Sequence, residues 1–277
     1  LHIPRVYAPI RGAVSRFRGL IGVVSMLAAC VPSTQQEVQL GTQYAQQINA
    51  QLPIVRDASV NSYINSLGGQ IARVADSRGL SWRFYVVDSR EVNAFAVPGG
   101  FVYVNRGLIE RARTMNQLAG VLGHEIAHVT ERHSVEQMAQ AERANLGVSL
   151  ACILTNVCQS GVGSTAIQVG GSALFAKFSR DDERQADARG FDFLLRAGID
   201  PRGMVNMFQT LLNERRSSPG SVDAWFRTHP LEEDRIDETN ARIARVPASQ
   251  LRGLTVDTPS YQSFRSRLSS LPVARTR

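Results

Sequence analysis

The stretch Gln117–Arg132, which reads QLAGVLGHEIAHVTER, decides the fold of this chain. Apolar residues recur in it at roughly helical spacing, without the strict alternation of a strand, so it predicts a helix with an apolar face. The letters HEIAH place His124 and His128 four positions apart, on one face of that helix. Two imidazoles in this arrangement can bind one metal ion. Glu125, one position round from the first histidine, can act on a water molecule as a general base without being a ligand.

A catalytic zinc ion needs one more protein ligand. Such an ion usually takes three protein ligands and keeps a fourth position open, so a His, Asp, Glu or Cys must come from another element. Glu183 and Asp187 lie four residues apart on a predicted helix and share a face. Spacing favours Glu183 as the third ligand, with Asp187 accepting a hydrogen bond from a ligand histidine, but it leaves the reverse assignment open. We therefore expect one Zn²⁺ per chain. Two surface histidines beside a glutamate are the alternative interpretation.

The composition indicates a globular protein with a substantial core. Of the 277 residues, 43% are hydrophobic and 20% are charged. The formal net charge of +7 is carried almost wholly by arginine. Four arginines precede residue 30 with no acid among them, and the remainder of the chain carries only +3. No basic cluster interleaved with aromatic residues accompanies this charge, so nucleic acid is not an expected partner.

The beginning of the chain resembles a targeting segment. The basic stretch Arg5–Arg18 precedes the mostly apolar run Gly19–Ala29, which is too short to span a bilayer. Leu27–Cys30, LAAC, resembles a bacterial lipobox, in which the cysteine is acylated after cleavage. This predicts a signal peptide at residues 1–29 and lipidation of Cys30. The next residue is valine rather than aspartate, which favours the outer membrane. An ordinary signal peptide or a short membrane anchor is the alternative.

Two further stretches give weaker signals. In an oxidising periplasm, Cys152 and Cys158 could form a disulfide, and two buried thiols are the alternative. The segment Ala144–Ala176 contains no charged residue and is rich in Gly, Ser, Ala and Thr. We expect a helix, a loop and a second helix there that cover the cleft as a lid. A buried helical hairpin or a segment that dips into the membrane surface are the alternatives.

The remaining patterns predict an α+β fold that is mainly α-helical. Trp82–Val87 reads as a strand and Asn93–Asn105 as a hairpin around a Pro-Gly-Gly turn. We expect a small antiparallel sheet behind the histidine-bearing helix. Its strand Phe101–Val104 is expected to be an exposed edge that could pair with an extended peptide. A purely structural hairpin is the alternative. Further helices are predicted at Thr34–Leu52 (from a Thr34–Glu37 capping box), Ala58–Arg78, Thr114 onward, Ser179 onward (from a Ser179–Asp182 capping box), Met204–Asn213, Glu232–Arg245 and Tyr261–Leu271.

Four ordered motifs resemble a known family. They are NAFAVPGGFVYVN (Asn93–Asn105), HEIAH, SRDDERQAD (Ser179–Asp187) and THPLEEDRI (Thr228–Ile236). They look like the HtpX-, BepA- and Oma-type zinc metallopeptidases, relatives of the CAAX prenyl protease, over about Tyr44–Arg245. The resemblance implies a zincin-like fold. Its E-x-x-x-D pattern implies Glu183 as the metal ligand, and its H-P-x(4)-R pattern maps onto His229, Pro230 and Arg235.

The multi-span membrane part of HtpX and the repeat domain of the BepA branch have no counterpart in this sequence. The expectation is therefore a compact periplasmic lipoprotein, with a metallopeptidase domain at residues 30–246 and a C-terminal tail at residues 247–277. Its predicted activity is endopeptidase cleavage of misfolded or misassembled periplasmic and outer-membrane proteins. A chaperone-like binding protein of the same fold and a hydrolase of non-peptide amides are the alternatives.

The predicted mechanism gives each site residue a role. Glu125 takes a proton from the attacking water, and Arg235, or less favourably His229, stabilises the charge of the tetrahedral intermediate. An ion pair within its own helix is the alternative for Arg235. His229 could instead fill the open metal position and hold the enzyme latent.

Overall fold

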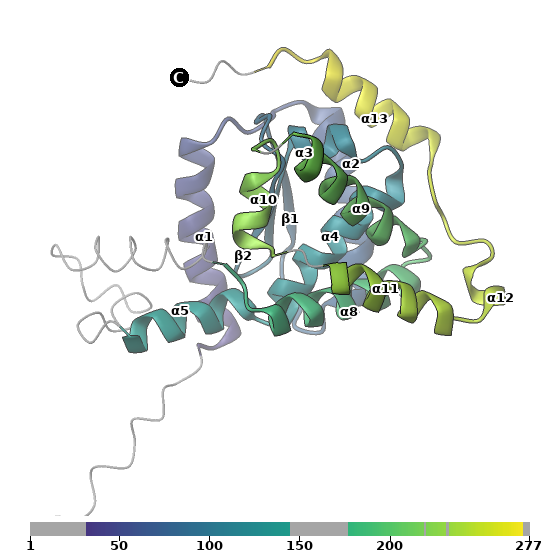
Figure 1. Ribbon diagram of the computed structural model, residues 1–277. Helices are drawn as coiled ribbons and strands as arrows, with labels where there is room; N and C mark the ends of the chain where they lie inside the picture. The colour runs from purple at the N-terminus through teal and green to yellow at the C-terminus, as the bar shows by residue number, and fades with distance from the viewer. Residues whose placement is uncertain (1–31, 145–176, 219, 231–232, 274–277) are drawn as a thin grey trace, which may run out of the picture. The chain divides into compact units, whose positions relative to one another are not determined.

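The computed structural model of the protein describes residues 32–144, 177–218, 220–230 and 233–273 (Figure 1). The predicted signal peptide, Cys30, the two other cysteines and all but the first residue of Ala144–Ala176 lie outside these residues. Within the described part, no helix is both long and apolar enough to cross a membrane.

The sheet is mixed, not antiparallel as predicted. Its strands are β1 (Arg83–Val87), β2 (Ala94–Val97) and β3 (Phe101–Asn105), in the spatial order β1-β3-β2. β3 runs parallel to β1 and antiparallel to β2. The prediction of an exposed edge at Phe101–Val104 is therefore wrong, because β3 is the central strand and is buried throughout.

The connection between β1 and β2 explains this order. After β1 the chain passes the position next to β1 before it forms β2. The hairpin that follows then places β3 between β1 and β2. The turn of that hairpin contains Gly99 and Gly100, whose φ angles of 84° and 98° are accessible to glycine at little cost. β2, at an edge of the sheet, is the strand that contacts the histidine-bearing helix most extensively.

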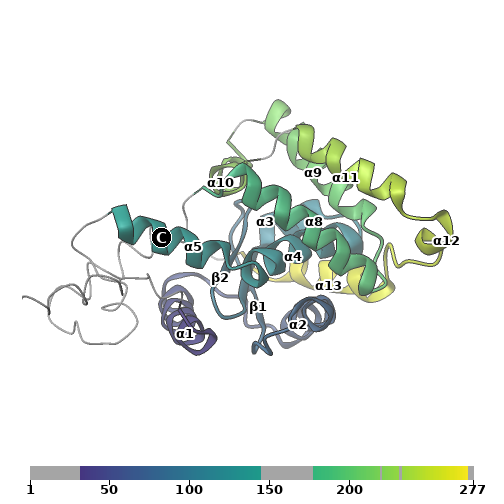
Figure 2. The ribbon, with the colours of Figure 1, turned by 90° about the horizontal axis from the view of Figure 1, so that it is seen from below.

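Side chains of β3 alternate between two clusters, as the pleat of a strand requires. Val102 and Val104 belong to the larger core with α2 (Ala58–Ala75) and α4 (Met115–Thr130). Phe101 and Tyr103 belong to a second cluster that α1 (Thr34–Gln51) covers. Figure 2 shows the strands between α1 and α4.

Helix α4 is the predicted histidine-bearing helix, and it lies at the centre of the larger core. Every residue from Met115 to Val129 is buried, because α2 and the sheet pack on one side and α8 and α9 on the other. The helix begins after Thr114, as predicted. The predicted capping box of α8 is also present, with Ser179 accepting from the backbone N–H of Asp182 at 3.1 Å.

The other described helices surround this centre. They are α3 (Arg106–Arg111), α5 (His133–Ala144), α8 (Arg180–Arg196), α9 (Arg202–Ser217), α10 (Asp223–Thr228), α11 (Glu233–Arg245), α12 (Ala248–Leu251) and α13 (Pro259–Ser270). The helix predicted at Tyr261–Leu271 is present as α13, which buries Tyr261, Phe264 and Leu268 in the larger core. The Tyr261 hydroxyl donates to the Ala112 carbonyl at 2.6 Å.

The start of α1 differs from the prediction. Ser33, not Thr34, is the N-cap, and its capping-box partner is Gln36. Glu37 is instead buried at 1% exposure. Its carboxylate pairs with the guanidinium groups of Arg78 at 2.8 Å and Arg132 at 2.9 Å. The local sequence pattern assigns Glu37 to a helix cap, but in the structure this side chain forms long-range ion pairs instead.

Candidate metal centre

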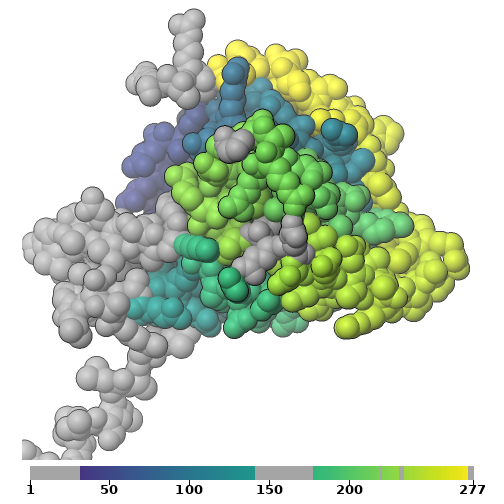
Figure 3. All heavy atoms as spheres, in the orientation of Figure 1, coloured from purple at the N-terminus to yellow at the C-terminus, as the bar shows by residue number. Residues whose placement is uncertain are grey.

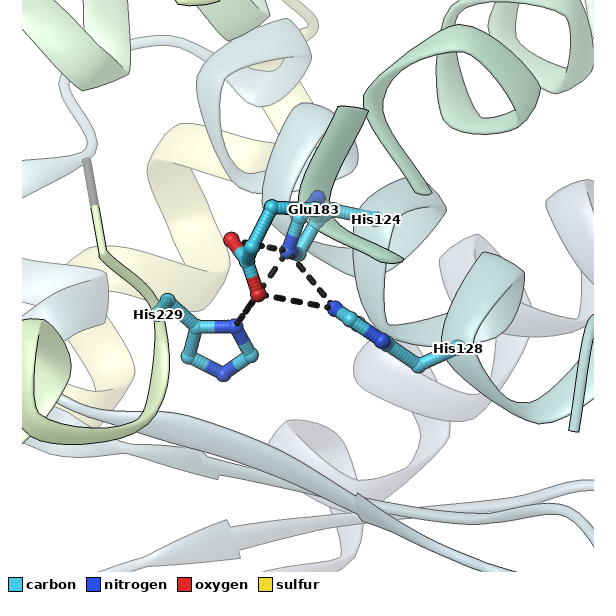
Figure 4. A group of neighbouring side chains, drawn as sticks. All are labelled: His124, His128, Glu183 and His229. Atoms are coloured by element: carbon cyan, nitrogen blue, oxygen red, sulfur yellow. Dashed lines mark hydrogen bonds and ion pairs between the residues drawn. The ribbon is translucent and has the colours of Figure 1, made fainter. Parts of the chain in front are cut away.

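The two histidines of HEIAH are buried in the middle of α4. His124 and His128 are 0% and 1% exposed, and their Nε2 atoms lie 3.0 Å apart (Figure 4). The i, i+4 spacing places the two rings on one face of the helix. In the space-filling view, residues beyond 177, coloured green to yellow-green, cover the centre of the side of the molecule that faces the viewer (Figure 3).

Helix α8 brings a carboxylate to these rings because it crosses α4 at a pair of glycines. A Cβ atom on Gly190 would lie 3.0 Å from the carbonyl carbon of Gly123, so a side chain there would force the neighbouring backbone to shift, and glycine suits this close approach. Glu183 then faces both histidines. Its Oε1 lies 3.4 Å from Nε2 of His128, and its Oε2 lies 3.6 Å from Nε2 of His124.

Asp187, one turn further along α8, contacts the other side of His124. Its Oδ1 lies 2.9 Å from Nδ1 of the histidine. Burial alone would raise the pKa of Asp187, but the charge of Arg235 and the bond to His124 outweigh it and lower that pKa. An ionised carboxylate only accepts hydrogen bonds, so Nδ1 of His124 carries the proton and Nε2 keeps its lone pair for a metal.

Arg235 of α11 holds both α8 carboxylates. Its Nε and Nη2 donate to Asp187 at 2.6 and 2.7 Å. Its Nη1 pairs with Glu183 and donates to the Pro230 carbonyl at 2.8 Å. Four of its five N–H groups are thus engaged, and its acidic partners lie on α8 rather than on its own helix. This geometry favours a positioning role over the predicted contact with a tetrahedral intermediate.

His229 joins the group from the residue that follows α10. Its Nδ1 lies 3.0 Å from Oε1 of Glu183 and 3.3 Å from Nε2 of His124. The ring of Trp225 stacks on it with centroids 4.6 Å apart. His124, His128, Glu183 and His229 each offer a ligand atom, and these four atoms lie within 4.8 Å of one another (Figure 4).

Two buried atoms beside this group have no hydrogen-bond partner among the described residues. They are Oε1 of Glu125 and Nε2 of His229, which lie 3.4 Å apart. Burial raises the pKa of Glu125, and the neighbouring His229 and His124 offset only part of this effect. A carboxylate with a raised pKa suits a general base near neutral pH. A buried acceptor without a hydrogen bond is costly, and such an acceptor is typical of a group whose partner is a substrate, water or ion.

The charge states of the donors fit a divalent metal. Burial lowers the pKa of His128 well below its usual value, despite the opposing effect of Glu183, so its imidazole is neutral. Burial would raise the pKa of Glu183, but the charges of His229, Arg235 and His124 lower it well below its usual value. Two imidazoles and a carboxylate, here a neutral His128 ring and an ionised Glu183 among them, form the donor set of a catalytic divalent site.

Three residues that contact the histidines were not predicted. Nδ1 of His133 lies 2.9 Å from Nδ1 of His128. The ring of Phe178 stacks on the ring of His128, with the two ring centroids 3.9 Å apart. Trp225 packs against His229. A third histidine five residues after HEIAH was an available signal for His133. The two aromatic residues occupy no pattern that distinguishes them from core residues.

The fold and the site together define an HExxH-type metallopeptidase with a zincin-like fold. Peptidase family M48 matches residues 58–243, and the chain belongs to this family, whose members depend on a metal. The resemblance predicted from the four motifs is therefore confirmed.

The chain is similar to several curated proteases. It is 32% identical to the Beta-barrel assembly-enhancing protease of Escherichia coli (strain K12) over 86% of this chain and 51% of that protein. It is 31% identical to the Metalloprotease YcaL of the same strain, over 67% of this chain and 73% of that protein. It is 28% identical to the Mitochondrial metalloendopeptidase OMA1 of Schizosaccharomyces pombe, over 73% of this chain and 59% of that protein. The chain spans about half the length of the assembly-enhancing proteases it matches.

Proposed function

We propose that the protein is a zinc-dependent endopeptidase of the bacterial cell envelope that cleaves misfolded or misassembled periplasmic and outer-membrane proteins. The observation that carries this proposal is the buried group of His124, His128 and Glu183, beside an oxygen of Glu125 that has no hydrogen-bond partner among the described residues. The name of the assembly-enhancing proteases supports the substrate class, because it refers to β-barrel assembly.

Each residue has a role in this chemistry. Zinc held by His124, His128 and Glu183 would supply a Lewis acid that acidifies water and polarises a carbonyl. Glu125 accepts the proton of the attacking water at its free oxygen and passes it to the leaving amine. Asp187 keeps the proton of His124 on Nδ1, which leaves Nε2 free to bind a metal.

The edge strand β2 is the proposed binding site for the peptide substrate. It lies beside α4, and no other strand pairs with its outer edge within the described ranges. An extended peptide could add there through main-chain hydrogen bonds. The peptide-binding strand is thus Ala94–Val97, in place of the predicted Phe101–Val104.

A cleavage assay tests the proposal. Purified protein is incubated with an unfolded outer-membrane β-barrel protein, with zinc or with a chelator, and fragments are followed by gel electrophoresis and mass spectrometry. We expect cleavage that the chelator abolishes and that Glu125→Gln reduces to background. An activity in cells that survives Glu125→Gln would contradict the peptidase and favour chaperone-like binding. Proteins that accumulate on the Glu125→Gln variant identify the substrate.

His229 is the proposed latch of the site. Its ring lies within reach of the same group of donors. Occupation of the fourth metal position by this imidazole would keep the enzyme latent. His229→Ala should then raise basal proteolysis. Unchanged proteolysis would contradict the latch, and lower proteolysis would contradict it and favour stabilisation of the intermediate instead.

Anchoring to the outer membrane through acylated Cys30 is the proposed localisation. The lipobox-like sequence LAAC supports it. Membrane fractionation of cells that produce the wild type or Cys30→Ala tests it. We expect the wild type in the outer-membrane fraction and the variant released from it, whereas equal membrane association of both would contradict the lipid anchor.

A further inference from the structure

Nδ1 of His128, the ring nitrogen that points away from the proposed metal site, has an uncommon hydrogen-bond partner. Nδ1 of His124 meets the carboxylate of Asp187, whereas Nδ1 of His128 meets another imidazole, that of His133, at 2.9 Å. His133 is 2% exposed and is the first residue of α5. Metal-binding histidines commonly donate their other ring N–H to a carboxylate, a carbonyl or water. An imidazole can accept that hydrogen bond only when it is held in the right tautomer.

A chain of hydrogen bonds selects this tautomer. Oε2 of Glu131 accepts from Nε2 of Gln185 at 2.7 Å, and a carboxylate can only accept. The Gln185 oxygen therefore faces His133, whose Nε2 lies 3.1 Å away and must donate. With its proton on Nε2, a neutral His133 has a lone pair on Nδ1 and accepts from Nδ1 of His128. The Nε2 atom of His128 then keeps its lone pair on the side of Glu183.

The turn between α4 and α5 places His133 beside His128. Arg132, in this turn, has a φ of 65°, in the left-handed region that residues other than glycine disfavour. Its Nε pairs with the buried carboxylate of Glu37 at 2.9 Å. Arg78 pairs with the same carboxylate and donates to the Val129 carbonyl, each at 2.8 Å. These bonds hold the end of α4 and stabilise an otherwise unfavourable turn.

The charges at the site explain why an imidazole is suitable here. Glu125, Glu183 and Asp187 bring three carboxylates to the buried group, and Arg235 brings one positive charge. When the carboxylates are ionised and His229 is neutral, a divalent cation balances the remaining two negative charges. A further carboxylate behind His128 would leave an uncompensated buried charge, which is costly. A neutral imidazole accepts the hydrogen bond without adding charge.

We propose that His133, oriented by Gln185, is a positioning residue that fixes the tautomer of His128 and thereby sets the metal affinity of the site. The inference rests on the proposed metal site. Neither side chain contacts the reacting atoms, so the expected effect is on metal binding first. Loss of such a hydrogen-bond partner typically weakens metal binding by about 10–100-fold.

Zinc affinity, measured separately from proteolysis, tests the proposal. Competition with a chromophoric chelator gives the Kd of the purified protein, and the visible spectrum of the Co²⁺-loaded protein reports the ligand geometry. His133→Leu removes the hydrogen-bond acceptor Nδ1 and puts an apolar side chain in its place. It should weaken zinc binding by about 10–100-fold and alter the Co²⁺ spectrum. His133→Asn, whose Oδ1 can accept in place of Nδ1, should restore most of the affinity.

Gln185→Met supplies a second measurement that does not depend on a buried substitution, because Gln185 is exposed. Without the carboxamide, only the more distant carboxylate of Asp182, whose Oδ1 lies 3.9 Å from Nε2 of His133, still favours this tautomer. Zinc binding should therefore weaken, but by less than in His133→Leu. Gln70→Met is the matched control: this exposed glutamine donates to the Ala197 carbonyl, which follows the opposite end of α8 from Glu183, and its loss should not change the affinity.

Two results would overturn different claims. Wild-type zinc affinity and an unchanged Co²⁺ spectrum in His133→Leu would overturn the positioning role. A wild-type protein that binds no divalent metal would overturn the proposed function itself.

Discussion

Replacement of Arg235 by methionine tests the charge balance of the site most severely. Arg235 is 3% exposed and pairs with Glu183 and Asp187, which are buried as well. Removing one partner of a buried ion pair costs about 3–5 kcal/mol, because the remaining charge is left uncompensated. At about 1.4 kcal/mol per factor of ten, the ratio of folded to unfolded protein should fall roughly a hundred- to several-thousand-fold. For a domain of this size the loss corresponds to a Tm lower by about 6–20 °C.

The pH dependence of this loss adds a second, independent expectation. Burial would raise the pKa of Asp187, but Arg235 outweighs it and the pKa is lowered in the folded protein. A lowered pKa contributes stability above the unfolded-state value, about 3.9, and this stability is lost as the pH falls through the folded-state pKa. Without Arg235, only His124 opposes the effect of burial, so the pKa of Asp187 rises and its contribution to stability shrinks. The penalty of Arg235→Met should therefore be larger at pH 7 than at pH 4.

Urea-induced unfolding with a chelator present, at both pH values, measures this penalty without a contribution from bound metal. Arg245→Met, an exposed arginine at the end of the same helix, is the control and should change the free energy of unfolding by less than about 0.5 kcal/mol. A loss below about 1 kcal/mol in Arg235→Met at pH 7, or equal losses at both pH values, would refute the assignment of Arg235 as the group that compensates the buried carboxylates.

Three further predictions concern the same core. Gly190→Ala would place a Cβ 3.0 Å from the carbonyl carbon of Gly123, so we expect α4 and α8 to shift apart by a few tenths of an ångström. Zinc affinity should fall by more than in Gly123→Ala, whose nearest contact is 3.4 Å, and equal affinities would contradict this. Tyr261→Phe removes the bond to the Ala112 carbonyl and should lower the free energy of unfolding by about 1 kcal/mol, measured in urea; no change would show that α13 does not depend on it. Burial raises the pKa of Glu125 above that of an ordinary glutamate, about 4.3. In a pH–rate profile, kcat/KM should therefore fall as the pH is lowered through this raised pKa. A fall in kcat/KM that occurs only at or below about pH 4.3 would contradict the role of this burial.

The parts of the site that were predictable from sequence depend on local geometry. His124 and His128 share a face because the helix repeat requires it, and the start of α8 follows from the Ser179 capping box. The approach of Glu183 to these rings also depends on Gly190, whose role is visible only once the two helices are seen to cross. The motif order that resembles M48 peptidases supplied that long-range link.

The features that sequence patterns misjudged depend on long-range contacts. The order of strands depends on where the connection after β1 runs, which alternation of side chains does not determine. The burial of Glu37 and the partners of Arg235 depend on arginines and acids brought together from distant helices. His133 contributes through one ring nitrogen, and its role requires knowledge of the hydrogen bond on the other side of the ring.

The location of the metal tests the central claim most directly. X-ray diffraction data from crystals of the purified protein, collected at the zinc absorption edge, would locate any bound zinc by its anomalous signal. We expect one peak per chain, within about 2.0–2.2 Å of a ring nitrogen of His124, a ring nitrogen of His128 and a carboxylate oxygen of Glu183. A zinc-loaded, folded protein with no peak at these three side chains, or with its peak elsewhere, would contradict it.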